Sequence, residues 1–565
     1  MVFHFENLRF EQNLFCLTPL KNNRMPYLDP YSGSFTTKEA RHLLKRASFG
    51  VTQALVNTSV TLGLTETINT LFIENALPDP PLKYSVDGLG GGEAVDPDAN
   101  YGETWVNGTT VPVATDSTST ASKIINFREQ SLHAWSFLQM QNAGISIQEK
   151  LTLFWHNHFV SVNGNSHLQY QYISLLRSNS LNNFKELTKL ITINPNMLRY
   201  LNGNQNTKSA PNENYSRELL ELFTIGKGDA VGNGDYTNYT EDDVVEIAKV
   251  LTGWRTRSLK HEDTLNTYFT NSRHTEGDKT LSHRFNNAII SENGENEYKD
   301  LIDVIFLQDE CSRFISRKLY RWFIKSEISD DVENNIITPL GVIIRNNNYD
   351  ITQALKILLA SDHFFENVFC MIKSPIDLLL SATKSLLVSA PTTSVRDEYE
   401  YAYILYLAAT DLEQSIFNHP DVAGWKAYYQ EPLYYKTWVN SYFLPKRLDY
   451  TKIIVTGGDL VISGKKYTIP PLVPVLAITA GITNSENPNV LITELSNQLF
   501  NYDISQNQID ALKDILIPGL PDFEWTVEYN EYLADPNDEA LKISVENKLR
   551  NLIGTMVQMS EFQIM

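Results

Sequence analysis

Cysteine is scarce in this chain of 565 residues, which contains three: Cys16, Cys311 and Cys370. Three dispersed cysteines exclude a disulfide framework and a zinc site of the Cys-x-x-Cys type. Basic residues are also few, with 47 against 67 acidic ones, so the formal net charge is −20. Because this excess of negative charge repels phosphate backbones and anionic lipid surfaces, we expect no nucleic-acid partner.

Long apolar runs are absent as well. No window of the sequence approaches 18 uncharged apolar residues, so we expect no transmembrane segment. Residues 1–24 lack the basic start of a secretory signal and carry charges within their apolar runs, and Met25 is an alternative start. Read literally, the sequence therefore predicts a cytoplasmic protein. It also lacks a Walker loop, a Gly-x-Ser-x-Gly turn and a Gly-x-Gly-x-x-Gly turn in a strand–helix context.

The sequence does contain repeated signals for the start of a helix. A capping box pairs a Ser, Thr or Asp with a Glu, Asp or Gln three residues later. This form occurs at residues 36–39, 146–149, 240–243, 350–353 and 505–508. Apolar residues then recur at helical spacing. We therefore predict an all-α fold, predominantly helical, with a core built from many helices.

Three segments depart from this helical pattern. Residues 78–118 are rich in Pro, Gly, Asp and Thr and predict a loop insertion on the surface. Residues 264–290 predict a β-hairpin, and residues 451–480 predict a small strand element. We accordingly divide the chain into an N-terminal extension, 1–35, and a helical domain, 36–565, which carries these three elements.

Two histidines make the predicted helix EKLTLFWHNHFV, residues 149–160, a candidate for chemistry. His156 and His158 are two residues apart, a rotation of about 200° on a helix, so they cannot both reach one ion. His156 is a candidate charge partner in catalysis, Trp155 a candidate substrate contact and His158 a candidate metal ligand. The alternative for each histidine is a hydrogen-bonded place in an aromatic core.

A second candidate helix lies in PNENYSRELLELFTIG, residues 211–226. Asn212 or Asn214 is predicted to cap it. Both asparagines, together with Tyr215 on the apolar stripe, are candidate substrate-binding residues. His274, in the predicted hairpin region, is a further candidate of this kind.

Glu218 borders the apolar stripe of that helix, beside Arg217. A carboxylate with apolar neighbours is costly unless it is paired or protonated. Glu218 is therefore predicted either to bind a cation, a metal or a buried donor, or to turn to solvent. Our hypothesis is the first of these: a substantially buried Glu218 that is bonded to a cationic or donor group. The favoured partners are Arg217, His156 and Asn212. In the functional interpretation Glu218 is a general acid/base with Arg217 as charge partner. In the alternative, Arg217 and Glu221 pair at i,i+4 on a solvated face.

Several long runs of the sequence resemble the bacterial "domain of unknown function 1800" family, in the family's order and over roughly residues 36–565. The resemblance implies a predominantly helical fold, frequent export and a frequent sulfatase-like partner from the "domain of unknown function 1501" family. It implies no established reaction. This chain has Phe223 where many relatives have His, and Thr275 where many have Asp, and both differences weaken a metal site. The main runs are HLLKRASFG (42–50), EKLTLFWHNHFV (149–160), APNENYSRELLELFTIG (210–226), YTEDDVVEIAKVLTGW (239–254), HTEGDK (274–279) and HPDVAGW (419–425).

Two functions remain open at this point. The first is a scaffold or binding component that works with a sulfatase-like partner protein. The second is a hydrolase or other enzyme that acts on an envelope or extracellular polysaccharide through a Glu/His/Arg cleft. A divalent metal is an open alternative as its cofactor, with Glu218, Glu221 and His158 as candidate ligands. An enzyme is expected to bring Glu218, His156 and His274 within about 4 to 8 Å around an open pocket.

Overall fold

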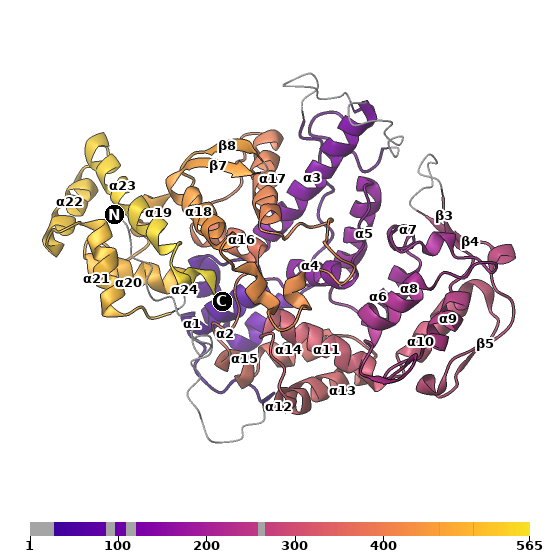
Figure 1. The fold of residues 1–565 in the computed structure, drawn as a ribbon. Helices are drawn as coiled ribbons and strands as arrows, with labels where there is room; N and C mark the ends of the chain where they lie inside the picture. The colour runs from indigo at the N-terminus through magenta and orange to yellow at the C-terminus, as the bar shows by residue number, and fades with distance from the viewer. Residues whose placement is uncertain (1–26, 86–95, 109–119, 258–265, 463, 501) are drawn as a thin grey trace.

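The chain folds into packed helices with small hairpins between them, as the helix-start pattern predicts. The computed structural model describes residues 27–85, 96–108, 120–257, 266–462, 464–500 and 502–565. In these ranges the strands form four two-stranded antiparallel sheets, and helices dominate the rest of the fold (Figure 1). The predicted all-α class with short hairpins is confirmed.

The first helix, α1, is buried over most of its length although it carries several charged side chains. Arg41, His42, Lys45 and Arg46 are buried together with its apolar residues. The N-terminal helices are α1 (Thr37–Ala47), α2 (Gln53–Leu71), α3 (Thr120–Asn142), α4 (Gln148–His158), α5 (Ser166–Ser178), α6 (Phe184–Thr192) and α7 (Pro195–Tyr200), followed by the 3-10 turn η1 (Gly203–Gln205).

The middle of the chain forms the part at the right of Figure 1 and the lower helices beside it. Its helices are α8 (Glu213–Glu218), α9 (Glu241–Val250), α10 (Glu297–Ile305), α11 (Asp309–Phe323), α12 (Asp330–Val332), α13 (Thr338–Asn346), α14 (Thr352–Leu359) and α15 (Asp362–Glu366). Its π-helical turns are η2 (Leu219–Thr224) and η6 (Glu333–Ile337), and its 3-10 turns are η3 (Asn271–Arg273), η4 (His283–Phe285) and η5 (Gly294–Asn296). Its strands are β1 (Ala230–Gly232), β2 (Asp235–Tyr236), β3 (Trp254–Thr256), β4 (Thr267–Phe269), β5 (Lys279–Thr280) and β6 (Ile289–Ile290).

The C-terminal third of the chain packs against α1. Lys45 Nζ donates to the carbonyl of Leu499 at 2.8 Å, and Arg46 Nη2 donates to the carbonyl of Met565 at 2.7 Å. Its helices are α16 (Pro375–Ser385), α17 (Val395–Asp411), α18 (Phe443–Thr456), α19 (Val475–Ala480), α20 (Pro488–Leu499), α21 (Gln506–Leu516), α22 (Asp522–Ala534), α23 (Glu539–Met556) and α24 (Ser560–Gln563). The 3-10 turns η7 (Lys426–Tyr428) and η8 (Tyr434–Trp438) and the strands β7 (Gly458–Ile462) and β8 (Lys465–Ile469) complete it.

Three of the predicted capping boxes form as expected. Thr36 and Glu39 cap α1, and the boxes that begin at Thr240 and Ser505 cap α9 and α21. The other two helices, α4 and α14, begin after Ile147 and Ile351, which provide no side-chain cap. Both isoleucines are fully buried, so apolar packing sets these two helix starts one residue later than the polar pattern predicts.

The predicted hairpins form with different bounds. β5 pairs with β6 inside the predicted segment, but β4 pairs with β3, which lies before residue 264. Between residues 451 and 480 only the centre is a hairpin, β7 with β8, because α18 and α19 occupy the two ends.

The described parts of the 78–118 insertion are anchored to α3. The Trp105 side chain is 1% exposed, and its Nε1 donates to Ser131 Oγ at 3.0 Å. Arg128 on α3 binds both carboxylate oxygens of Asp96, at 2.7 and 2.6 Å. The remaining residues of the predicted insertion, 86–95 and 109–118, lie outside the described residues.

Candidate functional site

The two histidines of α4 point in different directions, as their spacing predicts. His156 Nε2 accepts the backbone N–H of Phe417 at 3.0 Å, whereas His158 Nε2 lies 3.0 Å from the carbonyl oxygen of Phe223. Trp155, from the same helix, is fully buried, and its Nε1 donates to the carbonyl of Ser180 at 3.0 Å. All three side chains are therefore part of the packed core.

His156 also has an imidazole neighbour that the sequence did not single out. The rings of His156 and His419 have centroids 4.6 Å apart and meet edge to face. Burial lowers the pKa of His156 to about 3. The pKa of His419 lies well below its usual value, mainly because the ring is buried and to a smaller extent because His156 is near. Both rings are therefore neutral at pH 7. The HPDVAGW run was the available signal for His419, but only the fold places it beside His156.

The carbonyls at the end of the π-helical turn η2 are bound by side chains from distant helices. Lys318, on α11, donates to the carbonyl of Leu222 at 2.9 Å and lies 3.2 Å from Nδ1 of His158. A π-helix offsets the regular backbone pairing by one residue. Lys318 and His158 thus satisfy the carbonyls of Leu222 and Phe223 at this turn. Sequence reasoning did not single out Lys318, because only the fold brings α11 to this turn.

Of the two asparagines predicted to cap the 211–226 helix, Asn212 is the one that does so. Its Oδ1 accepts the N–H of Asn214 at 3.0 Å, and the amide of Asn214 in turn donates to the carbonyl of Leu201 at 3.4 Å. The Tyr215 hydroxyl donates to Thr192 Oγ1 at 3.0 Å within the core. These three candidate substrate contacts are held by the protein's own groups.

Two of the charged residues that follow, Arg217 and Glu221, belong to one network of ion pairs and hydrogen bonds. Arg217 makes a two-pronged ion pair with Glu241, at 3.0 and 2.7 Å, and lies 3.6 Å from Glu221. Glu221 also accepts a hydrogen bond from the Tyr239 hydroxyl. The predicted i,i+4 pair of Arg217 and Glu221 therefore exists, but Glu241 from the capped start of α9 is the stronger partner.

Glu218 differs from its two neighbours. Its side chain is half-buried, and within the described ranges no group donates a hydrogen bond to its carboxylate. Burial raises the pKa of Glu218, the nearby carboxylates of Glu221 and Asp421 raise it further, and Arg217 opposes them. The hypothesised bond from Glu218 to a cationic or donor group is not found among the described residues, and the side chain lies partly in solvent.

His274 belongs to a third, separate cluster. Its Nε2 lies 2.9 Å from Glu297 Oε1, and its Nδ1 lies 2.9 Å from the carbonyl oxygen of Thr252. Lys279 Nζ donates to the other Glu297 oxygen at 2.7 Å, and all three side chains are at most 2% exposed. This buried triad ties β5 and the His274 loop to the start of α10.

The predicted site residues thus have different bonding partners. His156 contacts the Phe417 loop, Glu218 lies on the partly exposed side of α8, and His274 is enclosed with Glu297. No three His, Cys, Asp or Glu side chains in the described part of the chain are placed to hold one metal ion. The candidate ligands Glu218, Glu221 and His158 accordingly do not form such a group there.

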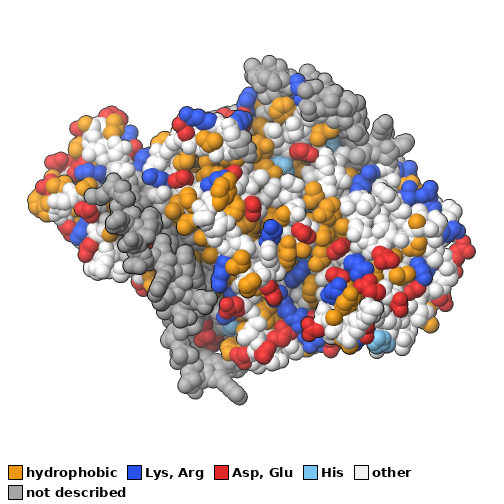
Figure 2. All heavy atoms as spheres, viewed as in Figure 1, with side chains coloured by type: hydrophobic (Ala, Val, Ile, Leu, Met, Phe, Trp, Pro, Cys, Tyr) orange, Lys and Arg blue, Asp and Glu red, His pale blue; other side chains and the backbone are white. Residues whose placement is uncertain are grey.

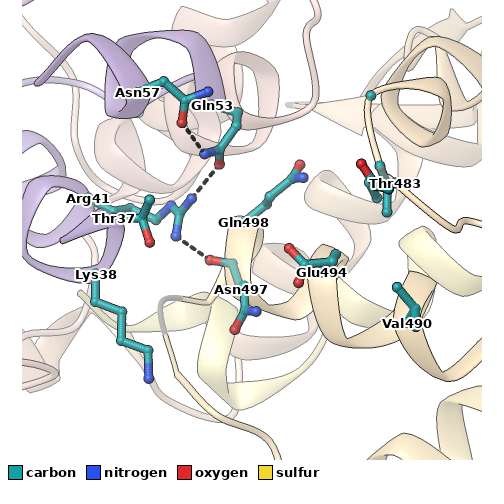
Figure 3. Close-up of a pocket in the computed structure, with 12 residues that line it drawn as sticks. Thr37, Lys38, Arg41, Gln53, Asn57, Thr483, Val490, Glu494, Asn497 and Gln498 are labelled. Carbon is teal, nitrogen blue, oxygen red and sulfur yellow. Dashed lines mark hydrogen bonds between the residues drawn. The ribbon is translucent and has the colours of Figure 1, made fainter. Parts of the chain in front are cut away.

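The cleft drawn in Figure 3 lies elsewhere, between α1, α2 and α20. It encloses about 530 Å³. Arg41 projects into it from α1 and is held between Gln53 of α2 and the backbone of α20 (Figure 3). Its lining is Thr37, Lys38, Arg41, Gln53, Asn57, Gly481, Ile482, Thr483, Val490, Glu494, Asn497 and Gln498. Sequence reasoning missed this cleft because its walls are more than 400 residues apart in the chain.

Comparison with family models places this chain in a family of unknown function. Residues 42–564 match the model described as "Protein of unknown function (DUF1800)", which is nearly the whole chain. The chain belongs to this family, as the sequence runs predicted. No curated protein and no solved structure matches it. In the described ranges, none of the helices has the length and hydropathy that a membrane span requires.

Proposed function

We propose that the protein is a non-catalytic binding component that works with a sulfatase-like partner protein. The observation that carries this proposal is that the polar motif residues bind different partners within the fold. Each of these side chains contacts a different group. The pairs are His156 with Phe417, His158 with Phe223, Arg217 with Glu241 and His274 with Glu297. Polar groups that bind across helices in this way lock the helices together and give a fold its uniqueness, although Nδ1 of His156 has no hydrogen-bond partner among the described residues.

An exposed apolar face offers a place for the partner. Phe523 and Val527 lie one turn apart on α22, so they share a side of the helix. Their side chains are 60% and 50% exposed, and Leu520, just before the helix, is 50% exposed. Contiguous apolar residues on a helix surface are typical of protein-binding faces. The face belongs to the C-terminal helices at the left of Figures 1 and 2.

Size-exclusion chromatography with light scattering tests this proposal directly. The full chain and the purified sulfatase-like partner are expected to elute as one complex. The double variant Phe523→Ser/Val527→Ser is expected to bind at least about tenfold more weakly, because apolar anchors dominate such interfaces. Its melting temperature is expected to stay unchanged, since both side chains are exposed.

The matched control is Leu307→Ser, a change at a side chain that is 78% exposed and follows α10. It is expected to bind like the wild type. Separate elution of the two proteins at micromolar concentration would contradict the proposal. Equal binding by the α22 double variant would place the interface elsewhere and overturn the docking face.

A second candidate function, an enzyme acting on polysaccharide, rests on Glu218. This carboxyl group is partly open to solvent, and burial together with Glu221 and Asp421 raises its pKa. A carboxyl group with a raised pKa is a suitable general acid. Turnover of an envelope polysaccharide that disappears in Glu218→Gln would favour this function over the binding role.

A further inference from the structure

The Arg41 guanidinium carries a positive charge that the protein leaves without a bonded counter-charge. Arg41 is 3% exposed, yet no carboxylate of the described residues forms an ion pair with it. Its two terminal nitrogens donate to neutral oxygens, the Asn497 carbonyl and Gln53 Oε1, both at 2.5 Å. Burial lowers the pKa of Arg41 to about 10, so the group remains charged at pH 7. Lys45 and Arg46 of the same helix also bind backbone carbonyls, but of these three cations Arg41 is the one that lines the cleft, where an anion can reach it.

The position of Arg41 is fixed by a short relay of side chains. Gln53 accepts from Arg41 through Oε1 and donates through Nε2 to Asn57 Oδ1 at 2.8 Å (Figure 3). This relay holds the guanidinium at the wall of the 530 Å³ cleft. Small-molecule sites typically enclose about 300–1,000 Å³.

The rest of the lining is rich in groups that suit hydroxyls. Four carboxamides line the cleft, from Gln53, Asn57, Asn497 and Gln498, and two hydroxyls come from Thr37 and Thr483. A carboxamide donates and accepts hydrogen bonds, which matches a hydroxyl group that does both. Since no aromatic side chain is among the described lining residues, the cleft offers no surface on which a base could stack.

The charge balance favours a ligand with one negative charge. Glu494 is exposed on the α20 side of the cleft, and its negative charge acts on Arg41. Lys38, at the rim, is already paired with Asp503 at 2.6 Å. Because the Glu494 carboxylate already opposes the Arg41 guanidinium, the cleft suits a singly charged carboxylate ligand better than a doubly charged phosphate. Arginine also binds a carboxylate through two parallel hydrogen bonds.

We propose that this cleft binds a small polyhydroxylated carboxylate, a sugar acid, with its carboxylate on Arg41 and its hydroxyls on the surrounding amides. The site is distinct from the partner face on α22, and the proposal does not depend on the sulfatase-like partner. The two proposals therefore fail or succeed separately.

Isothermal titration of the full chain with D-glucuronate tests the site. Saturable binding is expected, with D-glucose at least about tenfold weaker, because it lacks the charged hydrogen bonds. Inorganic phosphate is also expected to bind more weakly. Absence of saturable glucuronate binding, or equal binding of glucose or phosphate, would overturn the proposal.

Three variants locate the binding within the cleft. Arg41→Gln is expected to weaken glucuronate binding at least about tenfold. Asn57→Trp, at an exposed position, fills the cleft and removes the end of the relay, while Arg41 keeps its own bonds to Gln53 and Asn497. It is expected to abolish binding even if Arg41→Gln fails to fold. Glu494→Gln removes the opposing charge and is expected to tighten binding about two- to fivefold.

The matched control is Asn69→Trp, an exposed position on the same helix, α2, that does not line the cleft. It is expected to bind glucuronate as the wild type does. Wild-type affinity in both Arg41→Gln and Asn57→Trp, or weaker binding in Glu494→Gln, would show that glucuronate does not bind in this cleft.

Discussion

Glu218 and Glu221 lie one turn apart in the same helical segment but have opposite surroundings. Glu221 accepts from the Tyr239 hydroxyl and lies within 3.6 Å of Arg217 and Lys227. Glu218 lacks such contacts among the described residues, and its surroundings raise its pKa. The difference arises from the fold, because Tyr239 reaches Glu221 from outside the helix.

The two glutamates therefore make a matched pair of variants. A raised carboxyl pKa means that the ionised form is disfavoured in the folded protein, so Glu218→Gln is expected to leave the free energy of unfolding unchanged or to raise it. Glu221→Gln is expected to lower it by about 1–3 kcal/mol, since a charged hydrogen-bond partner is lost. Urea unfolding at pH 7 measures both. A loss of stability in Glu218→Gln as large as in Glu221→Gln would contradict this account.

His156 makes the stability of the protein depend on pH. Burial lowers its pKa to about 3, against about 6.5 for an imidazole in the unfolded chain. Between these pH values the unfolded state binds a proton that the folded state does not, so stability falls as the pH falls below 6.5. The contribution of this group between pH 7 and pH 5 is about 2 kcal/mol.

His156→Gln is expected to reduce that pH dependence. The Oε1 atom of the new glutamine can still accept the Phe417 N–H, and a glutamine side chain does not titrate. The loss of unfolding free energy between pH 7 and pH 5, measured by urea unfolding, is expected to be about 2 kcal/mol smaller than in the wild type. His283→Gln, at an exposed position, serves as the control. An unchanged pH dependence in His156→Gln would show that its imidazole does not contribute.

Among the elements, the sequence predicts best where the interactions are local. The boxes at Thr36, Thr240 and Ser505 form because each cap needs only residues within one turn. The π-helical turn η2 was not predictable, because Lys318 and His158 reach its carbonyls from other helices. The Arg41 cleft was not predictable for the same reason, since α20 supplies one wall and α1 the other.

The insertion shows a similar limit. Its composition predicts a surface loop, yet Trp105 within it is almost fully buried against α3. Aperiodic polar sequence identifies an irregular segment but does not say which of its few large apolar residues finds a partner. The described part of the 78–118 segment is thus irregular but anchored.

Trp105→Ala tests that anchor. Loss of this buried indole is expected to lower the free energy of unfolding by about 3–5 kcal/mol and to speed proteolytic cleavage within residues 78–118. Tyr101→Ala, at a side chain that is 41% exposed, is the control and is expected to have a small effect. Trypsin or thermolysin digestion at equal protein concentration measures the rates. Equal rates for Trp105→Ala and wild type would mean that the anchor does not restrain the segment.

Buried cations from three distant parts of the chain, α1, the segment before α16 and α18, bind oxygens of the last residues. Lys373 donates to the carbonyl of Phe562 at 2.6 Å, and Arg447 donates to Gln563 Oε1 at 3.0 Å. Arg46 reaches the carbonyl of Met565. Burial lowers the pKa of Lys373 to about 7 and that of Arg447 to about 9. The last residues therefore supply oxygens that these desolvated cations need.

Deletion of residues 562–565 is expected to destabilise the protein by about 3–5 kcal/mol, because buried charges lose their hydrogen-bond acceptors. Thermal unfolding of the shortened chain, compared with the full chain, measures this effect. An unchanged melting temperature would mean that the cations find other acceptors and that the C-terminal contacts are dispensable.

We propose that the polar motif residues hold the fold and that function lies in partner binding, and the His274→Ala variant separates these two roles. This variant leaves the buried Glu297 with Lys279 as its remaining side-chain partner in the triad. Titration of the folded His274→Ala protein with the sulfatase-like partner is the measurement. We predict a free energy of unfolding lowered by about 2–4 kcal/mol and a dissociation constant within about twofold of the wild type. Unchanged stability with lost partner binding or lost turnover would contradict the account.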